Sequence, residues 1–450
     1  MRLPQEIIEV IIAHLIHDLP SLRSCSLTCN SWYIASVPHI HTTLIVSISL
    51  KDRKLRWPNP IQHMNAFGLL PLIKTAQIRA LSDRFSPKFF NSGILRQFSA
   101  LTNVQTLKIA RLDLPSFMPT IREHFGPFLP TLRALYLKSP RGSDRQIIFF
   151  IGLFQHLEDL YLYCDPSFYC EKNAVEEDLT LIPPFSPPLQ GRLVVWYWPR
   201  RDFFRGMIDL FGEIRFEVMD LLSAFGTQYL LPACSKTLRV LHMYTIDYQC
   251  EHMRWRHHGG IQANDFVDGL SLHRFNLSHN KCLQTLVISA DSTGCAFLGV
   301  PAKYASKPFK YALSTLRSPT FSQVEVVYRG CDFSAIHFPQ PPALPYLHQP
   351  SQFEEWKEAA LYDGMFKILR QMYKVRRFQL TFCAEVSETA KEYAVQMLKE
   401  AVAEEKSGRE FNDPFPEPSV TFRPLRALEG DSPDNGFLPP LVIFPTHDPL

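Results

Sequence analysis

The chain has 450 residues, of which 46% are hydrophobic and 20% charged, a composition typical of a folded protein with two or three domains. Its formal net charge is +3 and its pI about 8.3, a basic balance too mild to indicate a nucleic-acid partner. Phenylalanine (34 residues) and proline (36) are frequent while glycine (19) is sparse. This mixture predicts an aromatic-rich interior and loops stiffened by proline.

The first twenty residues are rich in apolar side chains, but they do not have the pattern of a signal peptide. Acidic and histidine residues interrupt the apolar run, and no small-residue cleavage site follows. Nowhere do about eighteen apolar residues follow one another, so we expect no membrane partner. The ten cysteines include no CxxC pair, which is typical of reduced, mostly buried thiols. We therefore expect an intracellular protein of the cytoplasm, the nucleus or both.

Residues 3–41 predict three short helices. Pro4 suits the first turn of a helix that stops near His17. A second helix is expected within 21–29, and a third that ends before Pro38, because the residue preceding proline disfavours helical geometry. Three such helices expose more apolar surface than they bury, so something must cover the excess. Two interpretations are open: the helices pack on the rest of the chain, or they dock on a partner.

The string LPQEIIEVIIAHLIHDLPSLRSCSLTCNSWYIASVPHIH, residues 3–41, resembles the F-box, the motif that docks on the Skp adaptor of cullin ubiquitin ligases. It is especially similar to the expanded F-box families of mushroom-forming fungi, which share the run CSL-x-C-x-SW. Here that run is Cys25-Ser26-Leu27-Thr28-Cys29-Asn30-Ser31-Trp32. The match covers under a tenth of the chain, with almost every defining position filled in register.

The resemblance implies a set of adaptor contacts. They are Leu3, Pro4, Ile7, Ile8, Ile11 and Leu15 on the first helix, and Leu22, Cys25, Ser26, Leu27, Cys29 and Trp32 beyond it. The alternative that Ile8, Ile12 and Ile16 face the F-box's own core is open. Two residues depart from the family pattern: Thr28 replaces a common valine and adds a hydroxyl that needs a partner, and Asn30 replaces a common basic residue.

After His41 a different pattern begins, with apolar residues at positions one, four and six of a short string. The strings are Val104/Leu107/Ile109, Leu132/Leu135/Leu137, Leu157/Leu160/Leu162, Leu238/Leu241/Met243, Leu283/Leu286/Ile288 and Val375/Phe378/Leu380. The first three central leucines are 28 and 25 residues apart (135 − 107 and 160 − 135), within the leucine-rich-repeat period of roughly 20–29. Further strands are predicted at 42–49, 193–198, 214–219 and 321–329.

The asparagine that ends a leucine-rich-repeat string is absent here. Leu112, Pro140, Asp165, Ile246, Asp291 and Cys383 occupy the equivalent positions. We therefore expect uneven turns and a degenerate repeat, with any other alternation of strands and helices as the alternative. The predicted fold class is α/β (α+β overall): an N-terminal three-helix F-box, an irregular leucine-rich-repeat-like solenoid and a C-terminal capping helix.

The expected domains are 1–41 (F-box), 42–386 (repeat-like, substrate-binding) and 387–450 (capping helix and extended proline-rich tail). Proline-dense loops are expected at 181–189 and 338–350. A capping box predicts a helix from Ser351 to about Tyr373. A last helix is expected from 387 to 406, followed by a surface or partly disordered tail beyond Phe411.

No common catalytic or phosphate-binding motif occurs in the sequence. Cys250, Glu251, His252, His257 and His258 could be metal ligands, but their spacing favours a polar loop, and we expect neither metal nor cofactor. The stretch 252–258 mixes basic and aromatic residues, which we also interpret as a loop. An aromatic group could mark a binding surface but is more typical of a core; it comprises Tyr161, Tyr163, Phe168 and Tyr169.

The F-box resemblance implies a non-catalytic substrate receptor. Its partners would be the Skp adaptor, a cullin scaffold through that adaptor, and a protein substrate held by the repeat region for ubiquitination. One alternative is a scaffold that binds the adaptor without ligase function. The other is an enzyme of unknown class with a helical N-terminal cap, which would require a pocket with convergent titratable groups. The sequence identifies no substrate-binding residue.

Overall fold

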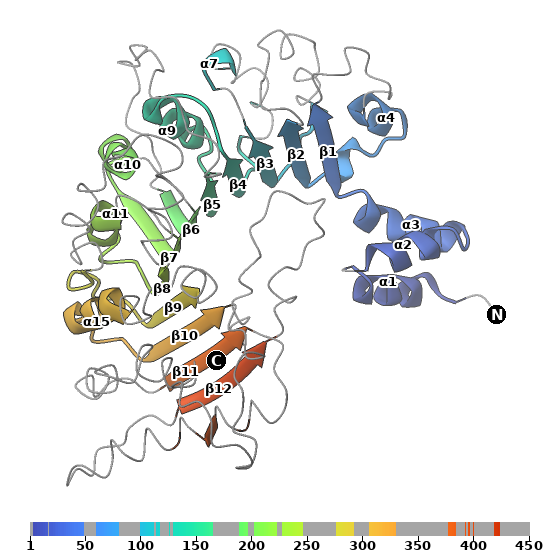
Figure 1. Cartoon of the computed structure of the whole chain (residues 1–450). Coiled ribbons are helices and arrows are strands. Elements are labelled where there is room, and N and C mark those ends of the chain that lie inside the picture. Colours follow the sequence, from blue (N-terminus) through green and yellow to red (C-terminus); the bar gives the residue numbers. More distant parts are fainter. Residues whose placement is uncertain are drawn as a thin grey trace, which may run out of the picture. The chain divides into compact units, whose positions relative to one another are not determined.

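The structure is a computed structural model that describes residues 3–16, 18–48, 60–80, 100–111, 114–117, 126, 129–164, 189–196, 202–222, 227–245, 276–291, 306–329, 377–383, 392, 395, 396, 399 and 418–423. The chain divides into two compact units, Met1–Pro187 and Pro188–Leu450. The fold is α/β, with parallel strands that alternate with helices or loops in both units (Figure 1).

The first unit begins with the three expected helices, α1 (Gln5–His14), α2 (Leu19–Ser26) and α3 (Asn30–Ile40). Helix α1 ends at His14, earlier than the expected stop near His17. Helix α3 continues through Pro38, so the prediction that it ends before this proline was wrong. Pro38 lies in the last turn of α3. Because proline has no N–H, the carbonyl of Ile34 loses its helical donor, but Ile34 is exposed and water can hydrate this carbonyl. The helix still closes normally, since His41 N donates to Val37 O at 3.1 Å.

Parallel strands in chain order follow the helices in the first unit. They are β1 (Thr43–Ile48), β2 (Thr75–Ala80), β3 (Thr106–Ala110), β4 (Ala134–Lys138) and β5 (Asp159–Tyr163). Between them lie α4 (Pro60–Ala66), the 3-10 turn Leu70–Leu72, α7 (Leu114–Phe117) and α9 (Asp144–Gly152). Ser143 begins α9 with a capping box: its Oγ accepts from Gln146 N, and the Gln146 side chain accepts from Ser143 N.

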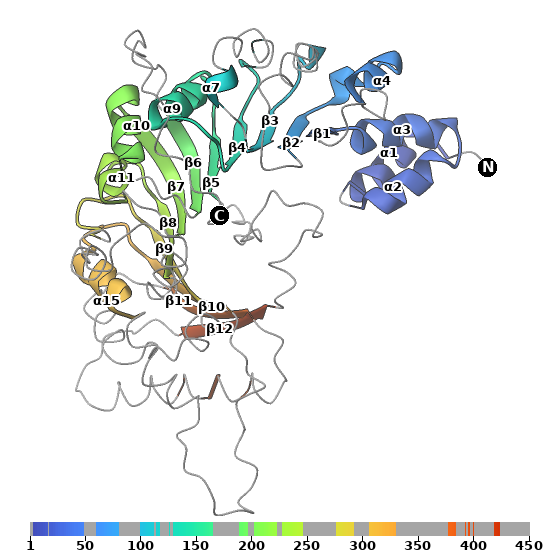
Figure 2. The ribbon, with the colours of Figure 1, turned by 45° about the horizontal axis from the view of Figure 1, so that its top comes forward.

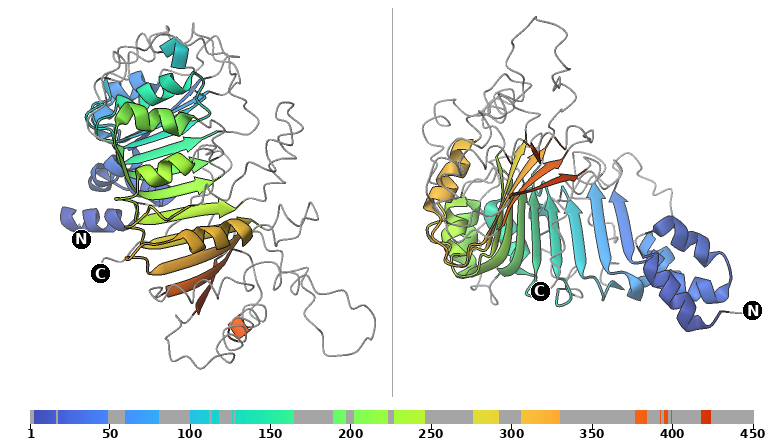
Figure 3. Two further views of the ribbon diagram at one scale, coloured as in Figure 1. Left: turned by 90° about the vertical axis from the view of Figure 1, so that its left-hand side faces the viewer. Right: turned by 90° about the horizontal axis from the view of Figure 1, so that it is seen from below.

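The second unit repeats the same arrangement. Its strands are β6 (Leu189–Trp196), β7 (Ile214–Leu222), β8 (Val240–Thr245), β9 (Thr285–Asp291), β10 (Gln323–Arg329), β11 (Arg377–Cys383) and β12 (Pro418–Arg423). Its helices are α10 (Phe203–Phe211), α11 (Thr227–Ala233) and α15 (Ser306–Thr315). Figures 1 and 2 show these helices along one side of the strands, and Figure 3 shows neighbouring strands running in the same direction.

The repeated strings align in space as they do in sequence. Leu107 pairs with Leu135 and Leu135 with Leu160; in the second unit Leu241 pairs with Leu286. These leucines are at most 1% exposed and define what we call the leucine face of each unit's strands. The largest fully buried side chains are phenylalanines, which confirms the aromatic-rich interior; they are Phe150, Phe154, Phe203, Phe204 and Phe216.

Two strands were missed from the sequence. Strand β2 contains the string Ile73/Ala76/Ile78, whose small central alanine hides the apolar spacing. Strand β12 lies within the region predicted to be a tail, so that prediction was wrong for Pro418–Arg423. This strand pairs with β11 and places Val420 beside Leu380. Its β-branched and aromatic sequence, PSVTFR, was a strand signal surrounded by prolines.

Several predictions concern residues outside the described ranges. These are the proline-dense loops expected at 181–189 (of which only Leu189 is described) and 338–350, the helix expected from Ser351 to Tyr373, and the stretch 250–258. Of the expected capping helix at 387–406, the described positions Glu392, Val395, Gln396 and Lys399 are helical. The expected boundary between residues 41 and 42 falls between the end of α3 and the start of β1.

Regular backbone hydrogen bonds join the starts of many strands to the strand before. Arg133 N and Ala134 N both donate to Gln105 O, at 2.8 and 2.9 Å. Gln284 N and Thr285 N donate in the same way to Arg239 O, at 2.8 and 3.0 Å. The same connection therefore recurs in both units, although the sequence spacing between successive strings drifts.

Hydroxyl side chains reinforce this connection. A threonine just before the first apolar position donates from Oγ1 to the carbonyl of the first apolar residue in the preceding string. The pairs are Thr131 with Val104 (2.9 Å), Thr237 with Phe216 (3.0 Å) and Thr320 with Leu283 (3.3 Å). We call these contacts the threonine ladder. They satisfy carbonyl groups at the strand starts, where the parallel ladder begins.

The turns after β3 and β4 are also alike, so the expected unevenness is not seen at these two turns. Arg111 and Ser139 adopt the left-handed conformation, with φ of 57° and 46°. Each donates its N–H to the last carbonyl of the next strand, Lys138 O or Tyr163 O, at 2.6 Å. A left-handed non-glycine residue costs roughly 1–2 kcal/mol, which this hydrogen bond offsets in part. Here a backbone turn provides the regularity that the missing asparagine would have supplied.

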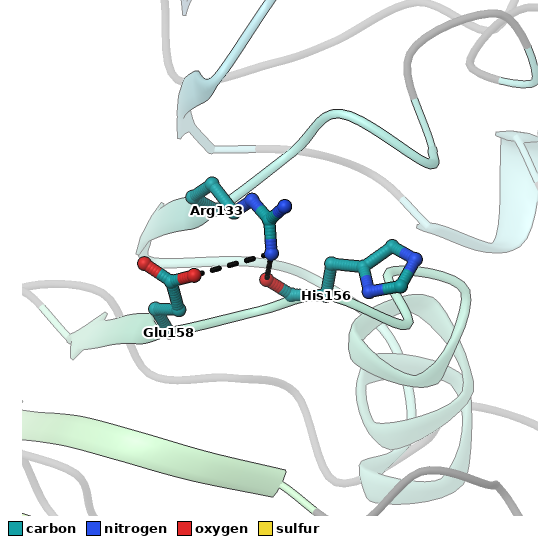
Figure 4. Close-up of polar contacts among 3 residues, drawn as sticks. All are labelled: Arg133, His156 and Glu158. Atoms are coloured by element: carbon teal, nitrogen blue, oxygen red, sulfur yellow. Dashed lines mark hydrogen bonds and ion pairs between the residues drawn. The ribbon is translucent and has the colours of Figure 1, made fainter.

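An ion pair joins the starts of β4 and β5. Figure 4 shows Arg133 pointing toward the residues ahead of β5: its Nη1 donates to Glu158 Oε1 at 3.1 Å and to His156 O at 3.5 Å. The side chains of Arg133 and Glu158 are 49% and 59% exposed, so the pair contributes little free energy.

Candidate functional site

The three N-terminal helices pack around a small core of their own. Its buried residues are Ile8, Ile12, Leu22 and Ala35, with Leu15, Cys25, Trp32 and Ile40 packed against them. Asp18 begins α2: its carboxylate accepts from Ser21 N at 3.1 Å and from Ser21 Oγ at 2.5 Å. These hydrogen bonds hold the pKa of the Asp18 carboxyl below its usual value.

The three helices expose many large apolar side chains among their polar and charged ones. Among the residues that the structure describes, the exposed large hydrophobic side chains are Leu3, Ile7, Val10, Ile16, Leu19, Leu27, Tyr33, Ile34, Ile45 and Phe67. All but the last two belong to the helical segment. Leu27 is 86% exposed and Ile34 57%. A soluble monomer rarely carries so dense an apolar surface on so short a segment, so this surface is the candidate functional site.

Most of the predicted adaptor contacts lie at this surface. Five of them are exposed: Leu3, Pro4, Ile7, Leu27 and Cys29. Five more are partly exposed: Ile11, Leu15, Cys25, Ser26 and Trp32. Ile8 and Leu22 are buried at 3% and 0%, so they support the surface from within and have no area left for direct contact. The sequence left open whether Ile8, Ile12 and Ile16 face the core of the helices. Ile12, like Ile8, is buried, whereas Ile16 is exposed.

The two residues that depart from the F-box pattern, Thr28 and Asn30, lie between α2 and α3 and at the start of α3. Thr28 Oγ1 donates to Ser24 O at 3.3 Å, which gives the added hydroxyl a partner inside the segment. Asn30 is exposed at the first position of α3.

A second group of polar residues lies inside the second unit. Trp196 Nε1 donates to Asp220 Oδ1 (3.4 Å), and Asp220 Oδ2 lies 3.5 Å from His242 Nδ1. His242 Nε2 lies 2.6 Å from Ser289 Oγ. Four neighbouring strands, β6 to β9, supply these four residues, and the strand register brings Asp220 and His242 side by side.

The order Asp220, His242, Ser289 is that of a nucleophilic triad, but the surroundings do not suit catalysis. The three residues are at most 2% exposed, so a substrate has no approach to the serine hydroxyl. Strand β9 pairs with β8 and β10, so the backbone N–H groups near Ser289 are engaged in the sheet rather than directed at an oxyanion. We therefore assign the group a structural role: it pairs the polar side chains of Trp196 with Asp220 and of His242 with Ser289 inside the unit.

This network was not predicted from the sequence. Its signal was a polar residue in the middle of each apolar strand: Asp220 in VMDLL, His242 in VLHMY and Ser289 in LVISA. Which of these residues meet depends on the register between strands that are distant in sequence. The sequence pattern alone therefore could not identify the network.

The two described tyrosines of the aromatic group, Tyr161 and Tyr163, are not part of a core. Tyr161 and Tyr163 are partly exposed and lie on the face of β5 opposite the leucine face, which corrects our preference for a core. Tyr161 stacks on Tyr136 with ring centroids 3.9 Å apart and an interplanar angle of 6°. Phe168 and Tyr169 lie outside the described residues.

The described cysteines differ in exposure. Cys164 and Cys234 are buried, Cys25 and Cys282 partly exposed, and Cys29 exposed. Burial raises the pKa of the Cys234 thiol to about 12, so it is protonated and unreactive at neutral pH. The sequence predicted mostly buried thiols. Of the five cysteines named above, two are buried.

Among the described residues, no group of three or more His, Cys, Asp and Glu side chains could hold a metal ion. Within the same ranges, no helix combines the length and apolar character needed to cross a bilayer. No protein-family model matches the chain, and no curated protein sequence matches it.

Proposed function

We propose that the chain is an F-box substrate receptor: α1 to α3 dock on the Skp adaptor of a cullin ubiquitin ligase, and the strands behind them present a protein substrate. The observation that carries this proposal is the apolar surface of residues 3–34, which coincides with the sequence run that resembles the F-box. No side chain would act chemically in this role. The receptor would raise the effective concentration of the substrate near the conjugating enzyme.

The energetics support docking through this surface. Burying one exposed leucine or isoleucine at an interface is worth about 1.5–3 kcal/mol, and several such side chains are exposed on the helical segment. The small core formed by Ile8, Ile12 and Leu22 sets the positions of these side chains. Folding the helices therefore prepares an apolar surface that a partner can cover.

The repeat region supports the second half of the proposal. We propose a degenerate leucine-rich-repeat-like solenoid, because successive strands within each unit are neighbours in chain order and aligned in register. The shared strand-start hydrogen bonds recur at successive strands, and the threonine ladder occurs at three of these junctions. Such stacks offer a long face of side chains on which a protein ligand can bind.

The proposal is tested by co-purification of the full chain with the Skp adaptor. The double variant Ile7→Asp, Leu27→Asp places charge in the apolar surface, and we expect at least about a hundredfold weaker binding. Aspartate at position 7 lies in the first turn of α1, where the helix dipole favours it, and Leu27 is 86% exposed, so neither change removes a core contact.

Phe67→Asp is the matched control, because Phe67 is a comparably exposed hydrophobic residue outside the three helices. It should bind the adaptor like the unchanged chain. Equal binding by the double variant and the control would contradict the assigned surface. If the adaptor binds but no cullin joins the complex, the chain is a scaffold without ligase function.

A further inference from the structure

One exposed flank of helix α1 is aliphatic. At about 100° per residue, Ile7, Val10 and Ile11 fall within an arc of about 100°, and Ile12 lies roughly opposite Val10. Ile7 is 47% and Val10 55% exposed, Ile11 is partly exposed, and Ile12 is buried. We call Ile7, Val10 and Ile11 the aliphatic strip. The helix thus buries one apolar side in its own core and leaves a second apolar side exposed.

The other exposed flank of α1 is acidic. Glu6 and Glu9 are exposed there, and the exposed Ala13 follows them after seven and four residues, which places it on the same flank. We call these three residues the acidic flank. Glu6 lies in the first turn, where the helix dipole favours a carboxylate, and Glu9 accepts from Gln5 Nε2 at 3.2 Å. Interactions within α1 therefore account for both acidic residues.

The two flanks differ in the cost of covering them. A partner that covers the aliphatic strip removes apolar area from water, which is favourable. A partner that covers the acidic flank must desolvate the carboxylates of Glu6 and Glu9, which is unfavourable unless it supplies a cation for each. Docking on the strip, with the acidic flank left at the solvent-exposed rim, is therefore the arrangement of lower free energy.

The aliphatic strip adjoins other residues of the predicted docking surface. Ile11 and Leu15 are four residues apart and are therefore neighbours on the surface of α1. Leu15, Cys25 and Trp32 all pack against the core of the three helices while remaining partly exposed. Ile11 thus links the strip to the partly exposed residues around the core, whereas the acidic flank lies on the other side of the strip.

We propose that Val10 is a direct contact of the Skp adaptor, and that the adaptor covers α1 over the aliphatic strip while the acidic flank stays in water. The F-box resemblance does not imply Val10. It implies Ile8, whose 3% exposure leaves no area for a partner. The inference rests on the proposed function and deepens it, because it assigns a further contact residue and the side of α1 that faces the adaptor.

The test measures adaptor binding by the purified full chain with single substitutions in α1. Val10→Gln places an amide on the aliphatic strip, where an apolar contact leaves it without hydrogen bonds, and we expect about tenfold weaker binding. Val10→Ala removes two methyl groups and should weaken binding about threefold to tenfold. Alanine and glutamine both have a higher helix propensity than valine, so neither substitution weakens α1 itself.

The matched control is Ala13→Gln, which places the same amide on the acidic flank of the same helix. It should bind the adaptor like the unchanged chain. A loss with Ala13→Gln as large as that with Val10→Gln would overturn the inference, because the two flanks would then be equivalent. Unchanged binding by both Val10 variants would overturn it as well.

The double variant Ile7→Asp, Leu27→Asp separates this inference from the proposed function. If the double variant loses adaptor binding while both Val10 variants keep it, the helices dock on the adaptor without Val10, and only the inference is wrong. If the unchanged chain does not bind the adaptor, the proposed function and the inference are both wrong.

Discussion

The strands of the two units share one pattern but differ on the face opposite the leucine face. In the first unit, β3 to β5 carry lysine and tyrosine side chains there, all partly exposed. In the second unit, β7 to β10 carry Asp220, His242, Ser289 and Glu325, which are 0–4% exposed. The same alternation thus produces a surface in one unit and a buried polar interior in the other. Strand periodicity sets which way a side chain points, whereas the packing around the strand decides whether water reaches it.

Removing a buried polar side chain from the second unit should give the largest loss of stability among the changes that test this comparison. His242→Leu deprives the Asp220 carboxylate and the Ser289 hydroxyl of their contact with the imidazole inside the unit. We expect a loss of about 3 kcal/mol in the free energy of unfolding, measured by urea denaturation.

The matched change in the first unit is Tyr161→Leu, at a partly exposed position of the opposite face. It removes one stacked ring, and the expected loss is about 1 kcal/mol or less. A loss as large as that of His242→Leu would show that the two faces do not differ as their exposure suggests.

A smaller effect tests what the two units share. Thr131→Val and Thr237→Val each delete one hydroxyl of the threonine ladder while keeping the side-chain shape. Each should lower the free energy of unfolding by about 1 kcal/mol, because the carbonyl of Val104 or Phe216 loses a donor. Thermal denaturation would show similar shifts for both variants if the ladder is equivalent in the two units, and clearly unequal shifts would contradict that equivalence.

The smallest expected effect concerns the ion pair at the start of β5. Arg133→Ala removes the contact with Glu158, and both side chains are about half exposed. The expected loss in the free energy of unfolding is below about 1 kcal/mol and should decline with added salt. A salt-independent loss of several kcal/mol would mean that Arg133 has a packing role.

Much of the fold could be predicted from the sequence because local patterns dominate it. The spacing of apolar residues at positions one, four and six identified strands from Val104 to Leu380, and β-branched runs identified others. Leu3-Pro4 and the apolar run behind it predicted α1. The wrong predictions arose where a local signal pointed away from the actual element. A small alanine hid the apolar spacing of β2, and flanking prolines hid β12. Pro38 suggested a helix end, but water can replace the N–H donor that proline lacks.

The candidate site was partly predictable for the same reason. Helical periodicity suggested that the N-terminal segment has more apolar residues than it can bury, and the F-box resemblance named the positions. The division between core and surface was not fixed by that pattern, because apolar residues surround most of α1. Packing with α2 and α3 places Ile8 and Ile12 inside and leaves Ile7 and Val10 outside.

The sequence by itself thus determined the succession of elements, the direction of each strand's side chains and the apolar character of the N-terminal helices. Only the tertiary structure decided which residues of distant strands meet. His242 contacts Ser289, 47 positions away, and Lys108 lies over Tyr136 because parallel register aligns their strands. Periodicity is a property of a few neighbouring residues, whereas register and burial depend on how strands from the whole unit pack together.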